Sequence, residues 1–288
     1  SDVFTFILGH LVKFGRTDHI DLFLYTSGGL TNAASGLVSL IREFTDNFTV
    51  IIPFKAQSAG TLIALGADSI VMTHVSQLSP VDPSITSPYN PTIPNPQPGA
   101  APQLLPVSVE DVIGFLDLAK QEAGLNDETS LTAVFQELSD KVHPLALGNV
   151  YRAREQIKLI ARRLLMGRTK HVLDDENVDN IVNTLTHELY SHDYIIGRKE
   201  AIETLKLPVE APNQQWDNRI WTLYQQYEKL LELTVPYNQD VLLGDRQVIQ
   251  HTFTRGIIES TDSTHAFQTT REIRRIQVSQ PNIPEPVV

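Results

Sequence analysis

Two bends in the sequence, each joining an apolar run to a helical segment, carry residues suited to acyl-transfer chemistry. Gly28 and Gly29 follow the run "IDLFLYT", and Ser58 follows the run "FTVIIP". Glycines let backbone N–H groups approach a ligand without an intervening Cβ. The N–H of Ala59 would lie at a helix start, where amide donors are unpaired and the helix dipole favours negative charge. This pattern predicts a serine nucleophile beside an oxyanion hole, in which each donor contributes roughly 3 kcal/mol.

A serine nucleophile needs a proton acceptor within hydrogen-bonding reach, and the sequence leaves that base open. The candidates are Lys55, Lys120, His74, His143 and His192. Lys55 is close to Ser58 in the chain, so we take it as the catalytic partner to be examined. A catalytic lysine must be desolvated to be neutral near pH 7, and the structural alternative for Lys55 is a solvent-facing residue at a strand end. For His143, which precedes a proline, a polar contact at a helix start is the structural alternative.

Neither a metal site nor a nucleotide site is expected. The histidines of "HELYSH", His187 and His192, are five residues apart, whereas a helical zinc site requires four. No P-loop and no dinucleotide-binding glycine motif is present. We therefore predict that the chain uses no metal and no cofactor.

The elements that would position Ser58 alternate between strands and helices. Short apolar runs at 20–26, 48–53 and 69–72 are separated by helical patterns at 31–44 and 58–66. Such alternation predicts an α/β fold with a parallel sheet, right-handed crossovers and flanking helices. In this arrangement the glycine bend and the serine bend would lie side by side.

The ordered motifs "SGG", "SAGTLIALGAD" and "SPVDP" resemble those of the Clp-like serine proteases of the ClpP/crotonase fold. The resemblance is closest to the signal peptide peptidase A branch and to the serine dehydrogenase proteinases. It is clearest over residues 20–85 and extends more weakly to about residue 208. It implies a ClpP/crotonase-like sheet, Ser58 as nucleophile, and an oxyanion hole formed by Gly28 or Gly29 with Ala59. It also implies that a peptide substrate adds as a strand beside the two glycines.

The general base does not carry over from this resemblance. Clp peptidases place a histidine some two dozen residues after the serine, where this chain has Asp82. Signal peptide peptidases place a lysine before a helix, where this chain reads "QLLPVSVEDV". A catalytically impaired scaffold or peptide-binding module is therefore the main alternative to a serine peptidase. Acyl-thioester chemistry with coenzyme A is a third possibility, because crotonase enzymes share the fold.

The rest of the chain predicts a long loop, further helices and a hairpin. Nine of the 17 prolines lie in 80–106, which we expect to be an extended surface loop, a flap at the substrate or an arm between subunits. Helical patterns follow at 108–124, 150–166 and 216–233, and two alternating segments flank the turn "TDS". We therefore divide the chain into a protease domain, 1–210, and a C-terminal helix and β-hairpin extension, 211–288.

Composition limits the partners and the compartment. The 288 residues carry a net charge of −11, which argues against a nucleic-acid partner. The basic face of helix 150–166 is expected to meet water or another subunit. Cysteine is absent, which is compatible with a reducing, cytoplasmic setting, and no apolar run is long enough to span a membrane. The chain begins within an amphipathic helical pattern, so we expect further structure upstream of Ser1. By analogy with the resembled proteases, we expect a homo-oligomer acting on peptides or unfolded proteins.

Overall fold

The computed structural model describes residues 2–82, 84–95, 100–189, 191 and 193–275. These residues form two compact units, which are described separately. The first unit contains residues 14–220, and the second combines residues 2–13 with residues 221–275 of the described chain. The predicted boundary between a protease domain and a C-terminal extension, at 210/211, stays a prediction.

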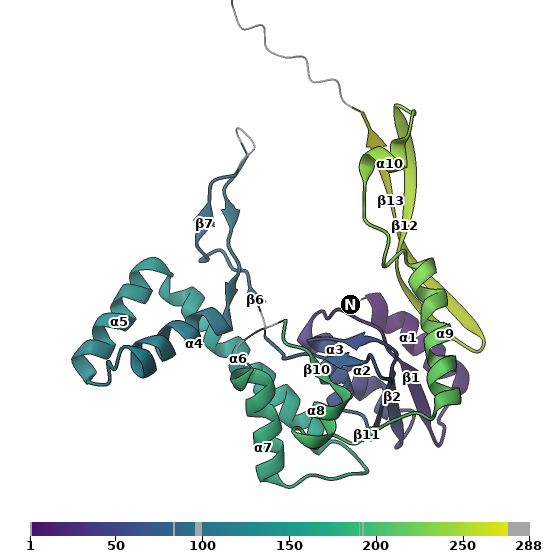
Figure 1. Ribbon diagram of the computed structural model, residues 1–288, viewed down its shortest axis with the longest axis horizontal. Coiled ribbons are helices and arrows are strands. Elements are labelled where there is room, and N and C mark those ends of the chain that lie inside the picture. The colour runs from purple at the N-terminus through teal and green to yellow at the C-terminus, as the bar shows by residue number, and fades with distance from the viewer. Residues whose placement is uncertain (1, 83, 96–99, 190, 192, 276–288) are drawn as a thin grey trace, which may run out of the picture. The chain divides into compact units, whose positions relative to one another are not determined.

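The first unit is built on a parallel sheet in the strand order β1, β2, β4, β11, three of whose strands, β1, β2 and β11, are labelled in Figure 1. Their bounds are Ile20–Phe23, Phe48–Ile52, Ser69–Met72 and Val209–Glu210. Side chains alternate between the two faces of a strand, so Phe48, Val50 and Ile52 are fully buried on one face. The predicted α/β fold with a parallel sheet is confirmed.

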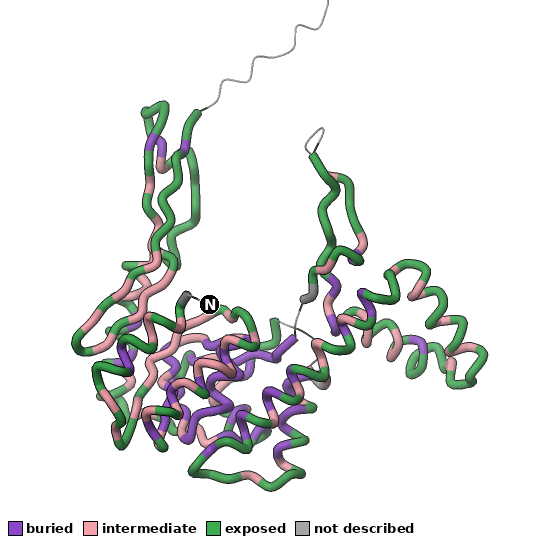
Figure 2. The backbone as a smooth tube through the Cα atoms, turned by 180° about the vertical axis from the view of Figure 1, so that it is seen from behind, coloured by how far each residue is buried: buried purple, intermediate pink, exposed green. Residues whose placement is uncertain are grey.

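Three helices pack together beside this sheet. They are α2 (Thr31–Arg42), α3 (Ala59–Leu65) and α6 (Pro144–Met166). A Cβ built on Gly66, directly after α3, would lie 2.7 Å from Val38 of α2 and 3.1 Å from Leu164 of α6. The buried residues concentrate in the sheet and these helices, as Figure 2 shows. The predicted flanking helices are therefore confirmed.

A second, smaller sheet brings the serine bend to the glycine bend. It runs in the order β10, β5, β3, with bounds Ile196–Gly197, Gln77–Leu78 and Lys55–Ala56. Strand β3 is parallel to β5, and β10 is antiparallel to β5. Thr26, which follows β1, forms a parallel bridge with Ala56.

The proline-rich segment at 80–106, expected to be an extended loop, contains short paired strands. β6 (Ser84–Ile85) pairs with β9 (Val107–Ser108), which directly follows the segment, and β7 (Thr92–Ile93) pairs with β8 (Gln103–Leu104). None of the paired residues is a proline, which has no N–H group to donate to a strand partner. The role of the segment as a flap or as an arm between subunits stays a prediction.

The helices that complete the first unit are α4, η1, α5, α7, η2, α8 and the beginning of α9. Their bounds are Val109–Asp117, Leu118–Glu122, Glu128–Lys141, Asp175–Asn183, Thr184–Glu188, Arg198–Glu203 and Gln214–Leu230. Ser108 is the N-cap of α4, and its Oγ accepts hydrogen bonds from the N–H groups of Glu110 and Asp111. The segments η1 and η2 are π-helical turns that extend α4 and α7.

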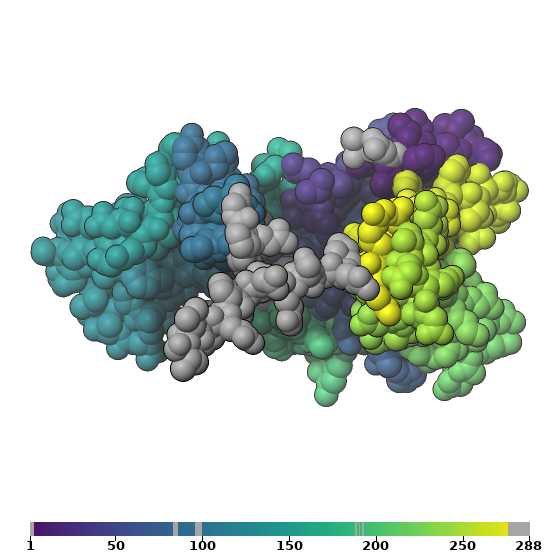
Figure 3. Space-filling model, turned by 90° about the horizontal axis from the view of Figure 1, so that it is seen from above, coloured from purple at the N-terminus to yellow at the C-terminus, as the bar shows by residue number. Residues whose placement is uncertain are grey.

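The second unit is a long hairpin packed against the first helix of the chain. The strands β12 (Val248–Ser260) and β13 (Ser263–Arg274) are antiparallel, which confirms the predicted hairpin, and the short α10 (Gln239–Leu243) precedes them. The imidazole of His10, in α1 (Asp2–Phe14), makes hydrogen bonds of 2.6 Å to Ser260 Oγ and 2.9 Å to His265 Nδ1. In Figure 3 the purple atoms of α1 lie beside the yellow hairpin. A two-stranded ribbon is marginal by itself, so α1 supplies packing that it needs.

One buried carboxylate joins three parts of the first unit. Asp68, 1% exposed, accepts hydrogen bonds from Arg42 Nη1 at 2.7 Å, from the Phe48 N–H at 2.9 Å and from the Lys170 N–H at 3.0 Å. Burial by itself would raise the pKa of Asp68, but these donors outweigh it and hold the pKa well below its usual range. Asp68 therefore links α2, β2 and the segment after α6.

We predict that Asp68→Asn lowers the free energy of unfolding by about 3–5 kcal/mol at pH 7, because Arg42 would lose its charged partner in a buried setting. The folded-state pKa is depressed, so this stabilisation is present above about pH 4 and is lost as the pH falls further. Urea denaturation followed by circular dichroism measures both effects. The control Asp46→Asn breaks an exposed pair with Arg16 and should cost under about 1 kcal/mol. Equal losses in the two variants would contradict the account.

Candidate active site

Ser58 lies in a strained turn between a strand and a helix. It lies two residues after the end of β3 and is the N-cap of α3, with φ of 51° and ψ of −109°. Positive φ is uncommon for residues other than glycine, and such strain persists only where the surroundings enforce it. A serine on a sharp strand-to-helix turn is the arrangement that presents a nucleophile in many hydrolases. The side chain is buried, at 9% exposure for the residue.

The glycine bend contacts this turn. A Cβ on Gly28, whose φ is 118°, would lie 3.1 Å from Ser58 Cβ and 3.6 Å from Ser58 Oγ. Two backbone hydrogen bonds hold the glycine bend against the serine bend. The Thr26 N–H donates to the Lys55 carbonyl at 3.0 Å, and the Gln57 N–H donates to the Thr26 carbonyl at 3.1 Å. The two bends therefore meet, as the parallel arrangement predicts.

Gly60 allows α3 to start close to the glycine bend. A Cβ at Gly60 would lie 2.5 Å from Thr26 Cγ2 and 3.1 Å from Ala56 Cβ. The first distance is shorter than side-chain carbons tolerate, so any larger residue would push α3 away from Thr26. Close packing is thus the role of this glycine, whereas Ser58 presents a hydroxyl.

The backbone amides around Ser58 divide into bonded and available groups. The Gly28 N–H donates to Thr26 Oγ1 at 3.0 Å, and the Ser58 N–H donates to Ser79 Oγ at 2.8 Å. Within the described chain, the N–H groups of Gly29 and Ala59 make no hydrogen bond to protein atoms. Of the three amides suggested from the sequence, those of Gly29 and Ala59 are therefore available to a ligand, and Gly28 shapes the bend.

Lys55 is not brought into contact with the serine hydroxyl. Its Nζ lies 5.8 Å from the ring centroid of Tyr25 and 5.9 Å from that of Phe54, which is cation–π geometry. No hydrogen bond joins Lys55 to Ser58 in the described structure. Free-enzyme geometry alone does not exclude a base, because catalytic hydrogen bonds often tighten only when substrate binds.

The other candidate bases have partners elsewhere or lie on the surface. The Nδ1 of His74 is 3.1 Å from Asp217 Oδ2. The Nδ1 of His143 accepts the Leu145 N–H at 3.1 Å, which is the polar contact expected at a helix start. Lys120 is exposed on η1. His192 lies outside the described residues.

Asp82, which stands where Clp peptidases place their histidine, belongs to a separate buried cluster. It is 8% exposed and accepts a hydrogen bond of 3.0 Å from Ser108 Oγ. Burial, followed by the nearby charge of Asp82, raises the pKa of Glu110 to about 7, and Arg154 partly offsets this rise. This cluster was missed by the sequence analysis. A signal was present, because Asp82 and Glu110 are the charged residues at the two ends of a stretch, 83–109, that contains no charged residue.

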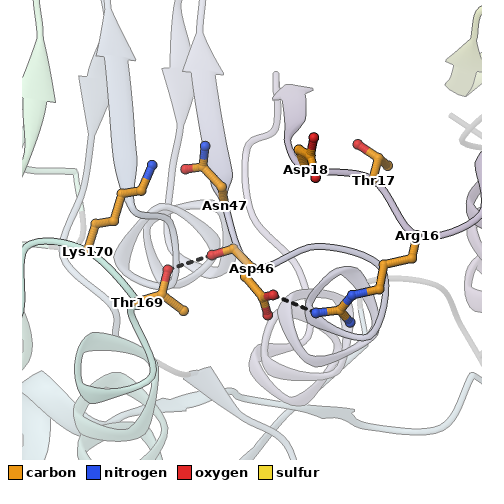
Figure 4. A pocket seen from close by; sticks show the side chains of 7 residues that line it. All are labelled: Arg16, Thr17, Asp18, Asp46, Asn47, Thr169 and Lys170. Carbon is orange, nitrogen blue, oxygen red and sulfur yellow. Dashed lines mark hydrogen bonds and ion pairs between the residues drawn. The ribbon is translucent and has the colours of Figure 1, made fainter.

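A pocket of about 640 Å³ lies away from Ser58. Asp18 and Asn47, on its wall, precede β1 and β2, whereas the two bends follow the ends of strands. Figure 4 shows Arg16 directed toward Asp46 and Thr169 donating to the Asp46 carbonyl. Three of its lining residues, Arg16, Asp46 and Thr169, are thus already bonded to one another, and the pocket lies at the opposite end of the sheet from Ser58. In the described part of the chain, no group of three or more His, Asp or Glu residues is placed to hold a metal.

Comparisons with known proteins give a match to one family model and similarity to several individual proteins. Residues 8–96 match the family model described as ClpP-like SDH-type serine proteinase. An uncharacterized protein of Methanocaldococcus jannaschii is 26% identical over 211 residues, which cover 73% of this chain and 59% of that protein. A second uncharacterized protein of the same organism is 46% identical over 66 residues, which cover 23% of each chain. A solved structure of a mutant 1510-N membrane-bound stomatin-specific protease with a substrate peptide has a TM-score of 0.40 and 15% identity, covering 75% of this chain and 70% of that one.

The match over residues 8–96 contains both bends and α3, so the resemblance seen in the sequence is confirmed over this segment, which is similar to ClpP-like SDH-type serine proteinases. The chain spans 59% and 23% of the lengths of the two curated relatives. Among the described residues, no helix combines the length and the apolar character needed to cross a bilayer.

We predict that Gly60→Ala destabilises the protein by about 1–3 kcal/mol, because the added methyl group would collide with Thr26. The matched control is Gly114→Ala in α4, where a Cβ meets nothing within 4 Å and alanine favours the helix by up to about 1 kcal/mol. Denaturant unfolding compares the two variants with the natural sequence. If Gly60→Ala were as stable as Gly114→Ala, the close approach of α3 to the glycine bend would be wrong.

Proposed function

We propose that this protein is a serine peptidase that hydrolyses peptide bonds through Ser58. The observation that supports the proposal is the close approach of Gly28 to the buried Ser58, because the available N–H groups belong to their chain neighbours Gly29 and Ala59. Ser58 Oγ attacks the substrate carbonyl carbon while its proton passes to a general base. The N–H groups of Gly29 and Ala59 stabilise the negative charge on the carbonyl oxygen. The amine product leaves with a proton, and water then hydrolyses the acyl-enzyme.

The substrate we propose is an extended peptide or an unfolded protein segment. Strand β3 is at one side of the small sheet, and Thr26 pairs with it through Ala56. Residues 26–29 therefore form the outermost segment beside Ser58, and an extended peptide can add to such an edge through main-chain hydrogen bonds. This mode recognises the backbone, so it suits substrates of varied sequence.

A peptide-binding scaffold without catalysis is the second candidate function. The observation that favours it is that no described side chain accepts a hydrogen bond from Ser58 Oγ. Under this alternative the glycine edge still binds peptides, but no acyl-enzyme forms. The two candidates differ in whether Ser58 reacts covalently.

We propose further that the protein works as a homo-oligomer in the cytoplasm. Helix α5 supports the assembly, because it carries an apolar stripe but contains no buried residue. The stripe consists of Leu131, Val134, Phe135 and Leu138, and Phe135 is 55% exposed. An apolar stripe at helical spacing normally packs against another element. The absence of cysteine supports a reducing compartment.

We expect a fluorophosphonate probe to label the protein at Ser58, and Ser58→Ala to abolish the labelling. Ser69→Ala is the control, because Ser69 is a serine of the first unit that lies in β4 and donates its hydroxyl to Glu210. Intact-mass analysis and peptide mapping give the site and extent of labelling. Equal labelling of the natural protein and Ser58→Ala would exclude the peptidase.

We expect Lys55→Met to lower the rate of labelling by about 10²–10⁴-fold if Lys55 supplies the base, since this is the usual contribution of general base catalysis. Lys120→Met, on the exposed face of η1, is the control and should react as the natural protein does. An unchanged labelling rate in Lys55→Met would show that Lys55 is not the general base. The role of Lys55 would then be limited to its cation–π contacts with Tyr25 and Phe54.

A further inference from the structure

We propose that Ser79 is a positioning residue that holds Ser58 in the conformation required for attack. The proposal rests on the proposed role of Ser58 as the nucleophile. It assigns to Ser79 no contact with substrate. Its effect is exerted through the backbone of Ser58.

The contact is a hydrogen bond with a fixed direction. The Ser58 N–H donates to Ser79 Oγ at 2.8 Å, and Ser79 Oγ in turn donates to the Pro80 carbonyl at 3.0 Å. A serine hydroxyl has one hydrogen and two lone pairs. Because the hydrogen is directed to Pro80, a lone pair remains for the Ser58 amide. The hydroxyl of Ser79 therefore acts as an acceptor toward the nucleophile's backbone.

Ser79 is itself held in place by α3. Its N–H donates to Thr61 Oγ1 at 3.1 Å, and its carbonyl oxygen lies 2.8 Å from the same hydroxyl. Ser79 is 1% exposed and Thr61 is fully buried, so water does not compete for these groups. Thr61 lies three residues after Ser58, in the helix that Ser58 begins. The acceptor and the strained residue are thus tied to the same helix.

Strain at Ser58 explains why this bond matters for chemistry. The positive φ of Ser58 persists only while its surroundings enforce it. Without the acceptor, the Ser58 N–H would be left without a partner, and rotation of the peptide toward a relaxed conformation would become favourable. That rotation would move Oγ relative to the N–H groups of Gly29 and Ala59. Displacements of about 1 Å between reacting groups can lower rates on the order of 10²-fold.

The chain offers a matched control for a purely structural role. Ser76 is 2% exposed, accepts the Thr73 N–H at 2.7 Å and donates to the Ile52 carbonyl. It therefore has the same chemistry as Ser79, namely one backbone donor and one backbone acceptor in a buried site. It makes no hydrogen bond to Ser58.

The test is the rate of fluorophosphonate acylation in Ser79→Ala, Ser79→Cys, Ser79→Thr and Ser76→Ala, at a temperature where circular dichroism shows each variant to be folded. We expect Ser79→Ala to react about 10- to 100-fold more slowly than the natural protein. Ser79→Thr keeps the hydroxyl and should restore the rate, whereas the weakly accepting sulfur of Ser79→Cys should give an intermediate rate. Ser76→Ala should lower the melting temperature without slowing acylation. If Ser79→Ala does not fold, the order of the Thr and Cys variants decides the question.

Two further readouts separate positioning from stability. With a peptide substrate, Ser79→Ala should lower kcat and leave KM nearly unchanged, because the peptide-binding edge is intact. Hydrogen exchange of the Ser58 amide should accelerate in Ser79→Ala but not in Ser76→Ala. Acylation of Ser79→Ala at the natural rate, or equal slowing in Ser76→Ala, would overturn the role of Ser79 and leave the peptidase intact. Failure of the natural protein to react at Ser58 would overturn both.

Discussion

The contact between Gly28 and Ser58 is the constraint on which the candidate site depends. A Cβ at position 28 would lie 3.1 Å from Ser58 Cβ, which is tighter than most such contacts, and the φ of 118° is one that favours glycine, so the missing side chain eases the approach of the two bends. Thr26 maintains the approach by bonding to both Lys55 and Gln57, and Gly60 lets α3 begin against Thr26. Each of these features would have little purpose without the others. Together they place the hydroxyl and two available amides at one edge of the small sheet.

Much of this arrangement follows from the sequence. The alternation of apolar runs and helical patterns predicts the parallel order of β1, β2 and β4, because crossover helices of suitable length separate the strands. The two alternating segments around the turn "TDS" are a local signal, and the structure confirms the hairpin that they predict. The juxtaposition of Ser58 with the glycine bend is predictable for the same reason, since adjacent parallel strands end at the same edge.

The interactions missed by the sequence analysis connect residues far apart in the chain. His10 meets Ser260 and His265 across some 250 residues, and no local pattern encodes that pairing. Asp68 and Ser79 carry no sequence signal that sets them apart from other loop residues. Their roles as acceptors of backbone N–H groups become visible only in the folded structure. The paired segments in the proline-rich stretch were missed because prolines normally argue against strands. The general base is the remaining open part of the site, because proton transfer depends on side-chain distances that sequence does not specify.

The most direct test of the account is the structure of the protein after reaction with a fluorophosphonate, because the phosphoryl oxygen mimics the oxyanion of the acyl-transfer intermediate. The account predicts a covalent bond to Ser58 Oγ and a phosphoryl oxygen about 2.7–3.1 Å from the N–H nitrogens of Gly29 and Ala59. An adduct whose oxygen faces away from both amides, or one attached to a different residue, would contradict the claim that the two bends form a single site.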